Sequence, residues 1–293
     1  MNLGAQRLTL AAMRLLSRLP LPVVRACGWV LGQLLHALAR RRREIARTNW
    51  RLCFPHQAES DVRQAVKAHF VRFAQAWLDR SWLWMAPEAV VRRRLSWQGA
   101  TQALATPSPV VVFAPHFVGM DAGWTALTLY GPRPGCGIYA PQLDELIDAW
   151  MATGRQRYGS PRIVAKRDGL KPLVAAMRAG HPLYLLPDMD HGMTESLWAP
   201  FFGVPAATLT SLPRFARLGR AAVVPVVAHL TPSGYRVEVK PAWTGYPSED
   251  LQADVCRMNR ELEHLIAEAP EQYFWVHKRF KTRPQGQGSV YRQ

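Results

Sequence analysis

The sequence predicts an α/β protein with a mostly parallel central sheet flanked by helices, preceded by an N-terminal amphipathic or hydrophobic helical segment that associates with a membrane. Two observations predict the sheet. Short β-branched runs alternate with amphipathic stretches of helical length, and two of the runs end in a proline followed by polar residues. A third observation, an apolar N-terminus rich in arginine, predicts the membrane-associated segment.

The first forty residues predict two helices at a membrane surface. Over residues 5–19, Arg7, Arg14 and Arg18 share one helical face and lie beside a stripe of leucines. Residues 23–39 are mostly apolar but fall short of the ~20 clean apolar residues that span a bilayer. No cleavage site of a secretory signal follows. The alternative is that these helices only cap a soluble core.

The charge distribution indicates anionic partners at both ends of the chain. Of the net charge of +16, residues 1–51 carry +9 and residues 278–293 carry +5, which leaves +2 for the rest. The run Arg40–Arg43 directly after the apolar segment favours docking on the anionic cytoplasmic leaflet. Because the basic residues flank apolar helices and the body is nearly neutral, we expect no nucleic-acid partner.

Cysteine usage and missing motifs limit the chemistry. The four cysteines are scattered, without a Cys-x-x-Cys pair or a histidine at zinc-ligand spacing, which argues for a reducing compartment and against a structural metal. The sequence has no Gly-x-Ser-x-Gly elbow, phosphate-binding glycine loop or dinucleotide fingerprint. We therefore expect neither a metal nor a cofactor.

The rest of the chain supplies the predicted sheet and its helices. Residues 60–85 form a helix with Ser60 as its N-cap, and residues 198–205 form an aromatic-rich loop. The predicted strands are 110–113, 162–165, 182–186, 221–228 and 235–240, and the other predicted helices are 120–130, 143–153, 170–179, 208–218 and 248–268.

A histidine and an acid after the first predicted strand form the candidate catalytic pair. The apolar run Val110–Phe113 delivers His116 to its carboxyl end, where ligands bind in open α/β sheets, and Asp121 follows one helical turn later. An aspartate that accepts from one ring nitrogen would leave the other free as a base. The same spacing in His56 and Asp61 lies in a polar turn, so we interpret it as a decoy. A buried histidine satisfied by a nearby acid is the alternative for His116.

Further charged residues are expected beside this pair. Asp188 and Asp190 follow the strand at 182–186 and should open at the same sheet edge, bound to an acceptor or to an arginine rather than to a divalent metal. Arg155 and Arg157, after the helix at 143–153, could meet phosphates or a developing oxyanion. Without a protein nucleophile, such a site suits transfer of an acyl group onto a substrate hydroxyl.

Six blocks in order along the chain resemble the bacterial late (secondary) acyltransferases of lipid A biosynthesis, the lauroyl and myristoyl transferases of the larger lysophospholipid and glycerolipid acyltransferase superfamily. The last block, APEQYFWVHKRFKTRPQG, is the most specific. The blocks are Arg42–Pro55, His116–Asp121, Ile138–Arg157, Asp168–Gly180, Leu186–Gly192 and Ala269–Gly286.

The resemblance implies roles for several residues. The catalytic dyad corresponds to His116 and Asp121, an important arginine to Arg155, and a strand-end acid to Asp188. Where the family pattern leads us to expect Tyr-Arg-Pro, this chain has Tyr139-Ala140-Pro141, which puts contacts to the acceptor or its phosphate in doubt.

The implied activity is transfer of a fatty acyl chain from acyl carrier protein to a hydroxyl of a lipid A precursor, by direct attack on the thioester. The implied location is the cytoplasmic face of the bacterial inner membrane, with a monotopic or single N-terminal anchor. An acyltransferase for another membrane lipid (a lysophospholipid or an amino-acid lipid) and a non-catalytic basic membrane-binding protein are the alternatives. As lining of an acyl groove we expect Trp124, Trp198, Phe201 and Phe202.

The expected organisation has three parts: a membrane-associating helical segment at 1–45, an acyltransferase domain at 46–286 and a flexible C-terminal tail at 287–293.

Overall fold

The computed structural model describes residues 3–165 and 169–291, so Asp168, where one of the family blocks begins, lies outside the described residues. The strands are β1 (Leu95–Gly99), β2 (Val110–Phe113), β3 (Cys136–Tyr139), β4 (Arg162–Ala165), β5 (Leu183–Leu185), β6 (Ser196–Phe201), β7 (Val204–Leu209), β8 (Ala222–Thr231) and β9 (Gly234–Val239). The helices are α1 (Leu3–Leu16), α2 (Leu21–Leu38), α3 (Arg40–Cys53), α4 (Glu59–Met85), α5 (Glu88–Arg94), α6 (Met120–Tyr130), α7 (Glu145–Arg155), α8 (Lys171–Arg178), α9 (Ser211–Gly219) and α10 (Leu251–Glu268), with short 3-10 turns at Thr101–Leu104 and Pro270–Gln272.

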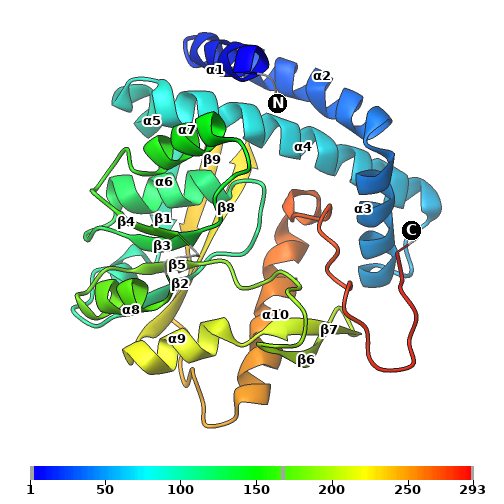
Figure 1. Ribbon diagram of the computed structural model, residues 1–293, viewed down its shortest axis with the longest axis vertical. Coiled ribbons are helices and arrows are strands. Elements are labelled where there is room, and N and C mark those ends of the chain that lie inside the picture. Colours follow the sequence, from blue (N-terminus) through cyan, green and yellow to red (C-terminus); the bar gives the residue numbers. More distant parts are fainter. Residues whose placement is uncertain (1–2, 166–168, 292–293) are drawn as a thin grey trace.

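In the described chain, seven strands form the central sheet in the order β1-β9-β8-β2-β5-β3-β4. All neighbouring pairs are parallel except β8 and β9. Helices α6 and α7 lie on one side of the sheet, and α8 and α9 lie on the other (Figure 1). The predicted architecture, a mostly parallel sheet flanked by helices, is confirmed.

Strand β2 lies at the centre of the core. Val110 and Val112 join one hydrophobic cluster, whereas Val111 and Phe113 join the other, and all four side chains are fully buried. Successive side chains of a strand point to opposite faces, so a sheet covered on both sides needs apolar residues at every position. This explains why β2 is a continuous apolar run rather than an alternating one.

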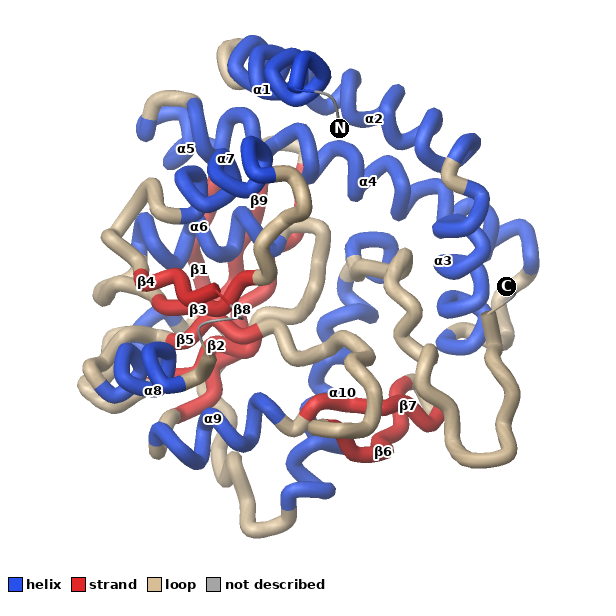
Figure 2. Tube along the Cα trace, in the orientation of Figure 1, coloured by secondary structure: helices blue, strands red, loops and turns tan. Residues whose placement is uncertain are grey.

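Three local predictions were wrong. The segment predicted as an aromatic-rich loop is the β6–β7 hairpin, which forms its own two-stranded sheet (Figure 2). As a result α9 begins at Ser211 rather than at residue 208. Ser60 does not cap α4, because the helix begins at Glu59 with Ala58 in the N-cap position.

Helix α2 packs closely along α4. A Cβ atom on Gly28 would lie 2.7 Å from Gln75 Cα, and one on Gly32 would lie 2.5 Å from Val71 Cα, so only glycine allows this approach. Arg25 of α2 forms an ion pair of 3.0 Å with the fully buried Asp79 of α4. Among the described helices, α2 is the one long and apolar enough to cross a membrane by length and composition, with 28% of it buried in the fold.

The end of the chain returns to helix α3. Tyr291 is buried, and its hydroxyl accepts from the backbone N–H of Phe280 at 2.9 Å and donates to the Asn49 side chain. This residue belongs to the segment expected to be a flexible tail. The division into three parts stays a prediction.

Candidate active site

Sheet register places two of the predicted site residues side by side. Strands β2 and β5 are parallel neighbours, and Phe113 pairs with Leu185. His116 and Asp188 each stand three residues beyond that pair. Because the carboxyl ends of parallel strands meet at one sheet edge, both side chains reach the same place.

Asp188 holds His116 through two contacts. The Nδ1 atom of the His116 ring lies 2.7 Å from Asp188 Oδ1, and the backbone N–H of His116 donates to Asp188 Oδ2 at 3.0 Å. Burial alone would raise the pKa of Asp188, but the adjacent His116 outweighs it and lowers that pKa. An ionised carboxylate only accepts, so the ring proton is assigned to Nδ1. This leaves Nε2 as a bare base on a ring whose side chain is 21% exposed.

Asp121 does not orient His116, contrary to the expectation from their spacing. Its two carboxylate oxygens bind Arg80 Nε at 2.7 Å and Arg155 Nε at 2.9 Å. Burial would raise the pKa of Asp121, yet the guanidiniums of Arg155 and Arg80 hold it well below its usual range. The physical reason is the sheet, which supplies a closer acid to His116 from β5 and leaves Asp121 to two cations.

The segment at 270–277 closes around the histidine. Phe274 donates its backbone N–H to the carbonyl of His116 at 2.9 Å, and its ring lies 6.4 Å from the His116 ring. Val118 likewise donates its N–H to the carbonyl of Gln272 at 2.8 Å. The sequence block that we singled out as most specific therefore packs directly on the His116 loop.

A second histidine, His277, was missed by sequence reasoning. The backbone N–H of Asp190 donates to His277 Nε2 at 3.1 Å, so the ring proton of the neutral imidazole must sit on Nδ1. Burial, His116 and Arg279 lower the pKa of His277 to about 4, which keeps it neutral at neutral pH. Asp188 and Asp190, two residues apart, thus hold one imidazole each.

The chain is similar to known proteins over nearly its whole length. Residues 3–282 match the family model of the bacterial lipid A biosynthesis acyltransferases. The chain belongs to this family. It is 33% identical to the lipid A biosynthesis palmitoleoyltransferase of Escherichia coli K12 over 280 residues, which cover 94% of this chain and 90% of the relative.

Two further relatives of the lipid A acyltransferase family come from the same organism. The lipid A biosynthesis lauroyltransferase is 32% identical over 284 residues, which cover 94% of this chain and 91% of the relative. The lipid A biosynthesis myristoyltransferase is 29% identical over 268 residues, which cover 90% and 82%. The resemblance inferred from six sequence blocks is confirmed over nearly the whole chain.

Two other predicted residues, Asp190 and Arg157, bind within the fold. Asp190 accepts from the N–H and hydroxyl of Thr282, both at 2.7 Å, and from the N–H of Gly192 at 2.9 Å. Arg157 donates to the carbonyls of Leu83 and Ala86 at the end of α4. In the described chain neither aspartate after β5 pairs with an arginine, so of the two expected partners only the acceptor stays a prediction.

The four aromatic residues expected to line an acyl groove lie on two elements. Trp124, on α6, is buried and donates its Nε1–H to the carbonyl of Arg155 at 2.7 Å. Phe201 ends the first strand of the β6–β7 hairpin and Phe202 begins its turn, with their ring centroids 5.0 Å apart, and half-buried Trp198 lies on the same strand as Phe201. Their role with an acyl chain stays a prediction.

A cluster on β8, β9 and α10 has the donor types of a metal site. Ligand atoms of His229, Glu238 and Glu268 lie within 4.8 Å of one another. Lys240 Nζ, however, lies 3.0 Å from Glu238 and 2.9 Å from Glu268. One ammonium group thus already contacts both carboxylates, and the His229 ring packs against the Phe117 ring, with centroids 5.8 Å apart.

Proposed function

We propose that this chain transfers a fatty acyl chain from an acyl-carrier-protein thioester to a hydroxyl of a lipid A precursor. The observation that carries the proposal is membership of the lipid A acyltransferase family over residues 3–282, and the relatives named above are a palmitoleoyl, a lauroyl and a myristoyl transferase. The open Nε2 of His116 is consistent with it, because acyl transfer to a hydroxyl needs a general base.

His116 acts as that base in the proposed mechanism. Its Nε2 takes the proton of the acceptor hydroxyl as the oxygen attacks the thioester carbonyl. The C–O bond forms, the C–S bond breaks, and the imidazolium returns the proton to the departing thiolate. Asp188 keeps the proton of the resting ring on Nδ1 and stabilises the imidazolium. The attack is direct, so no acyl-enzyme forms.

Asp121 binds two guanidiniums instead of orienting this base. Arg80 and Arg155 each use Nε for Asp121, which leaves the terminal nitrogens of both forks available. We assign them to anionic groups of the acceptor or donor, or to charge that develops on the reacting oxygen. This arrangement keeps the sequence-based assignment of Arg155 to substrate and adds Arg80.

The decisive test of function is mass spectrometry of the acceptor. The purified chain is incubated with a hydroxylated lipid A precursor and a panel of acyl-carrier-protein donors of different chain length. Mass gain on the precursor that matches the donor acyl group is the expected result. Gain on a lysophospholipid but not on the precursor would overturn the choice of acceptor.

His277 is proposed as a hydrogen-bond donor to the oxyanion. With Nε2 engaged by Asp190, the free donor of its neutral ring is Nδ1–H. At position 277, asparagine would place its side-chain N–H near the position of the histidine Nδ1. Glutamine would place its side-chain amide near the position of Nε2. We expect His277→Asn to retain most of kcat and His277→Gln to lose about 10²–10³-fold. The opposite order in single-turnover rates would show that His277 only holds the Asp190 loop.

The proposed location is the cytoplasmic face of the inner membrane, with α2 lying in the interface. Its docked face carries Gly28, Gly32 and buried Arg25, while Val30 and Leu34 on the other face are 51% and 52% exposed. An exposed apolar face on a helix that is fixed to the body suits insertion into a bilayer surface rather than a span.

Charges on the exposed face of α2 should release the protein from vesicles. Val30→Glu with Leu34→Glu is expected to weaken binding to anionic vesicles by about ten-fold or more, because each buried aliphatic side chain contributes roughly 1.5–3 kcal/mol. Leu170→Glu with Leu218→Glu, at positions 50% and 55% exposed on the other side of the molecule, is the matched control. Equal loss in flotation assays for both variants would contradict an α2 interface.

A further inference from the structure

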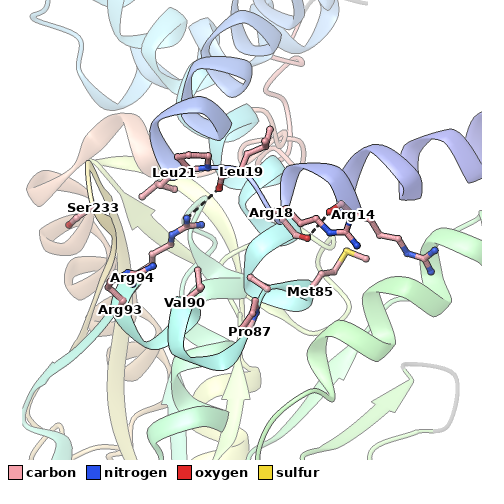
Figure 3. A pocket seen from close by; sticks show the side chains of 13 residues that line it. Arg14, Arg18, Leu19, Leu21, Met85, Pro87, Val90, Arg93, Arg94 and Ser233 are labelled. Atoms are coloured by element: carbon pink, nitrogen blue, oxygen red, sulfur yellow. Dashed lines mark hydrogen bonds between the residues drawn. The ribbon is translucent and has the colours of Figure 1, made fainter.

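A cavity of about 1000 Å³ opens where α1 meets the junction of α4 and α5 (Figure 3). Four arginines line it: Arg14 near the end of α1, Arg18 in the turn after it, and Arg93 and Arg94 at the end of α5. Its size is in the range of ligand-binding cavities. The mechanism proposed above uses none of these residues.

The positive charge of this cavity is only partly countered, because the buried Asp79 acts on Arg94 alone among the lining arginines. No acidic residue lines it, and Glu88, on the same short helix as Arg93, is bound to Arg92 at 2.7 Å. Within the described part of the chain, the guanidiniums of Arg14, Arg18 and Arg93 form no ion pair. Like charges gathered without an acid repel one another, so an anion entering the cavity gains from all of them.

Arg94 contributes an unsatisfied buried donor. Its Nη1 is buried without a hydrogen-bond partner among the described residues, and its Nη2 reaches the carbonyl of Leu19 only at 3.5 Å. The guanidinium is held over the Trp82 ring, 5.2 Å from the centroid. A buried donor without a partner destabilises the fold unless an acceptor arrives, and this one is already oriented.

The remaining walls are apolar. Leu19, Leu21, Met85 and Val90 line the cavity between the arginines. Next along the chain, Leu15 on α1 and Val23 on α2 are 61% and 43% exposed. A ligand with an anionic head and an apolar tail can contact both the arginines and the apolar residues of the lining. The exposed Leu15 and Val23 lie between the cavity and the proposed membrane face.

We propose that this cavity binds the phosphate group of a membrane lipid, with Arg14, Arg18, Arg93 and Arg94 as its donors. Phosphate accepts several guanidinium hydrogen bonds at once, so it suits a cavity lined by several arginines better than a carboxylate does. Two lipids offer this group: an anionic glycerophospholipid of the leaflet, and the phosphorylated acceptor of the proposed reaction. Only the second source rests on the proposed function.

Vesicle binding by the full-length chain tests the cavity. The vesicles contain phosphatidylcholine alone, phosphatidylcholine with phosphatidylglycerol, or phosphatidylcholine with a bisphosphorylated lipid A. The cavity variant is Arg14→Gln with Arg18→Gln. Its charge-matched control is Arg178→Gln with Arg214→Gln, which are exposed on α8 and α9 and lie outside the cavity. Arg93→Gln, at an exposed position on α5, is a second cavity variant that leaves α1 unchanged.

The cavity variants are expected to lose about ten-fold or more in affinity and the control much less, since each charged hydrogen bond is worth a factor of roughly ten. Loss on phosphatidylglycerol vesicles assigns the glycerophospholipid, and loss confined to lipid A vesicles assigns the acceptor. Equal loss for cavity and control variants, or none for the cavity variants, overturns the proposal. Binding needs no acyl donor, so a failure of acyl transfer would leave this result standing.

Discussion

Replacing His116 with alanine is expected to lower acyl transfer to the lipid acceptor by about 10³–10⁴-fold or more. A general base alone contributes about 10²–10⁴-fold to the rate in typical enzymes. Among the described residues, no other side chain is placed to accept the proton that Nε2 of His116 would take. The fold should survive, because the His116 side chain is partly exposed. Asp188 would still accept a hydrogen bond from the backbone N–H of residue 116. Radiolabelled acyl transfer and a thermal melt measure the two effects separately.

His56 supplies the matched control for this experiment. It has the same five-residue spacing to an aspartate, but it lies in an exposed turn before α4, far along the chain from any strand end. His56→Ala should leave turnover within about two-fold of the wild type, as is usual for surface substitutions. Near-normal turnover of the His116 variant, or a matching loss in the His56 variant, would refute the assignment of the base.

The strands of the central sheet were predicted well from the sequence. The run Val110–Phe113, followed by a proline and a histidine, needs burial on both faces, and the structure places it in the middle of the sheet. The strands near 162–165, 182–186, 221–228 and 235–240 were predicted by the same kind of pattern and are present.

The β6–β7 hairpin and strand β3 were missed because their sequences also contain residues typical of loops. Residues 198–205, predicted as a loop, contain Pro200 and Pro205, and proline cannot donate to a ladder. In the β6–β7 hairpin these two prolines face each other, so neither removes a bond that the other strand requires. Strand β3 is preceded by Gly131, Pro132 and Pro134, and its four residues were too short to stand out.

The candidate site shows where local spacing stops being informative. His116 and Asp121 lie five residues apart in one segment, whereas Asp188 comes from another strand and becomes a partner only through the register of β2 and β5. A polar residue two or three positions beyond each predicted strand end was visible in the sequence, but the pairing of those strands was not. Arg80, inside the long helix α4, and His277 had no pattern that tied them to the site.

Asp188→Asn and Asp121→Asn should therefore have separable consequences. In the Asp188 variant the amide oxygen can still accept from the backbone N–H of His116, which turns the NH₂ group toward Nδ1. The ring must then accept at Nδ1 and carry its proton on Nε2, where it can no longer act as a base. We expect kcat to fall by about 10³–10⁴-fold, as for the equivalent change in a catalytic triad, with a small change in melting temperature.

In the Asp121 variant we expect the main loss in stability, and a smaller loss of activity than in the Asp188 variant, because only the positions of Arg80 and Arg155 change. Arg80 and Arg155, with side chains 11% and 20% exposed, would share no counter-charge. Removing one partner of a buried ion pair typically costs about 3–5 kcal/mol, because the remaining charge is left uncompensated. Asp121→Glu, which preserves the charge, should recover part of that loss. If Asp121→Asn instead cut kcat as deeply as Asp188→Asn without lowering the melting temperature, then Asp121 would be the partner that matters to His116, as the spacing alone suggested.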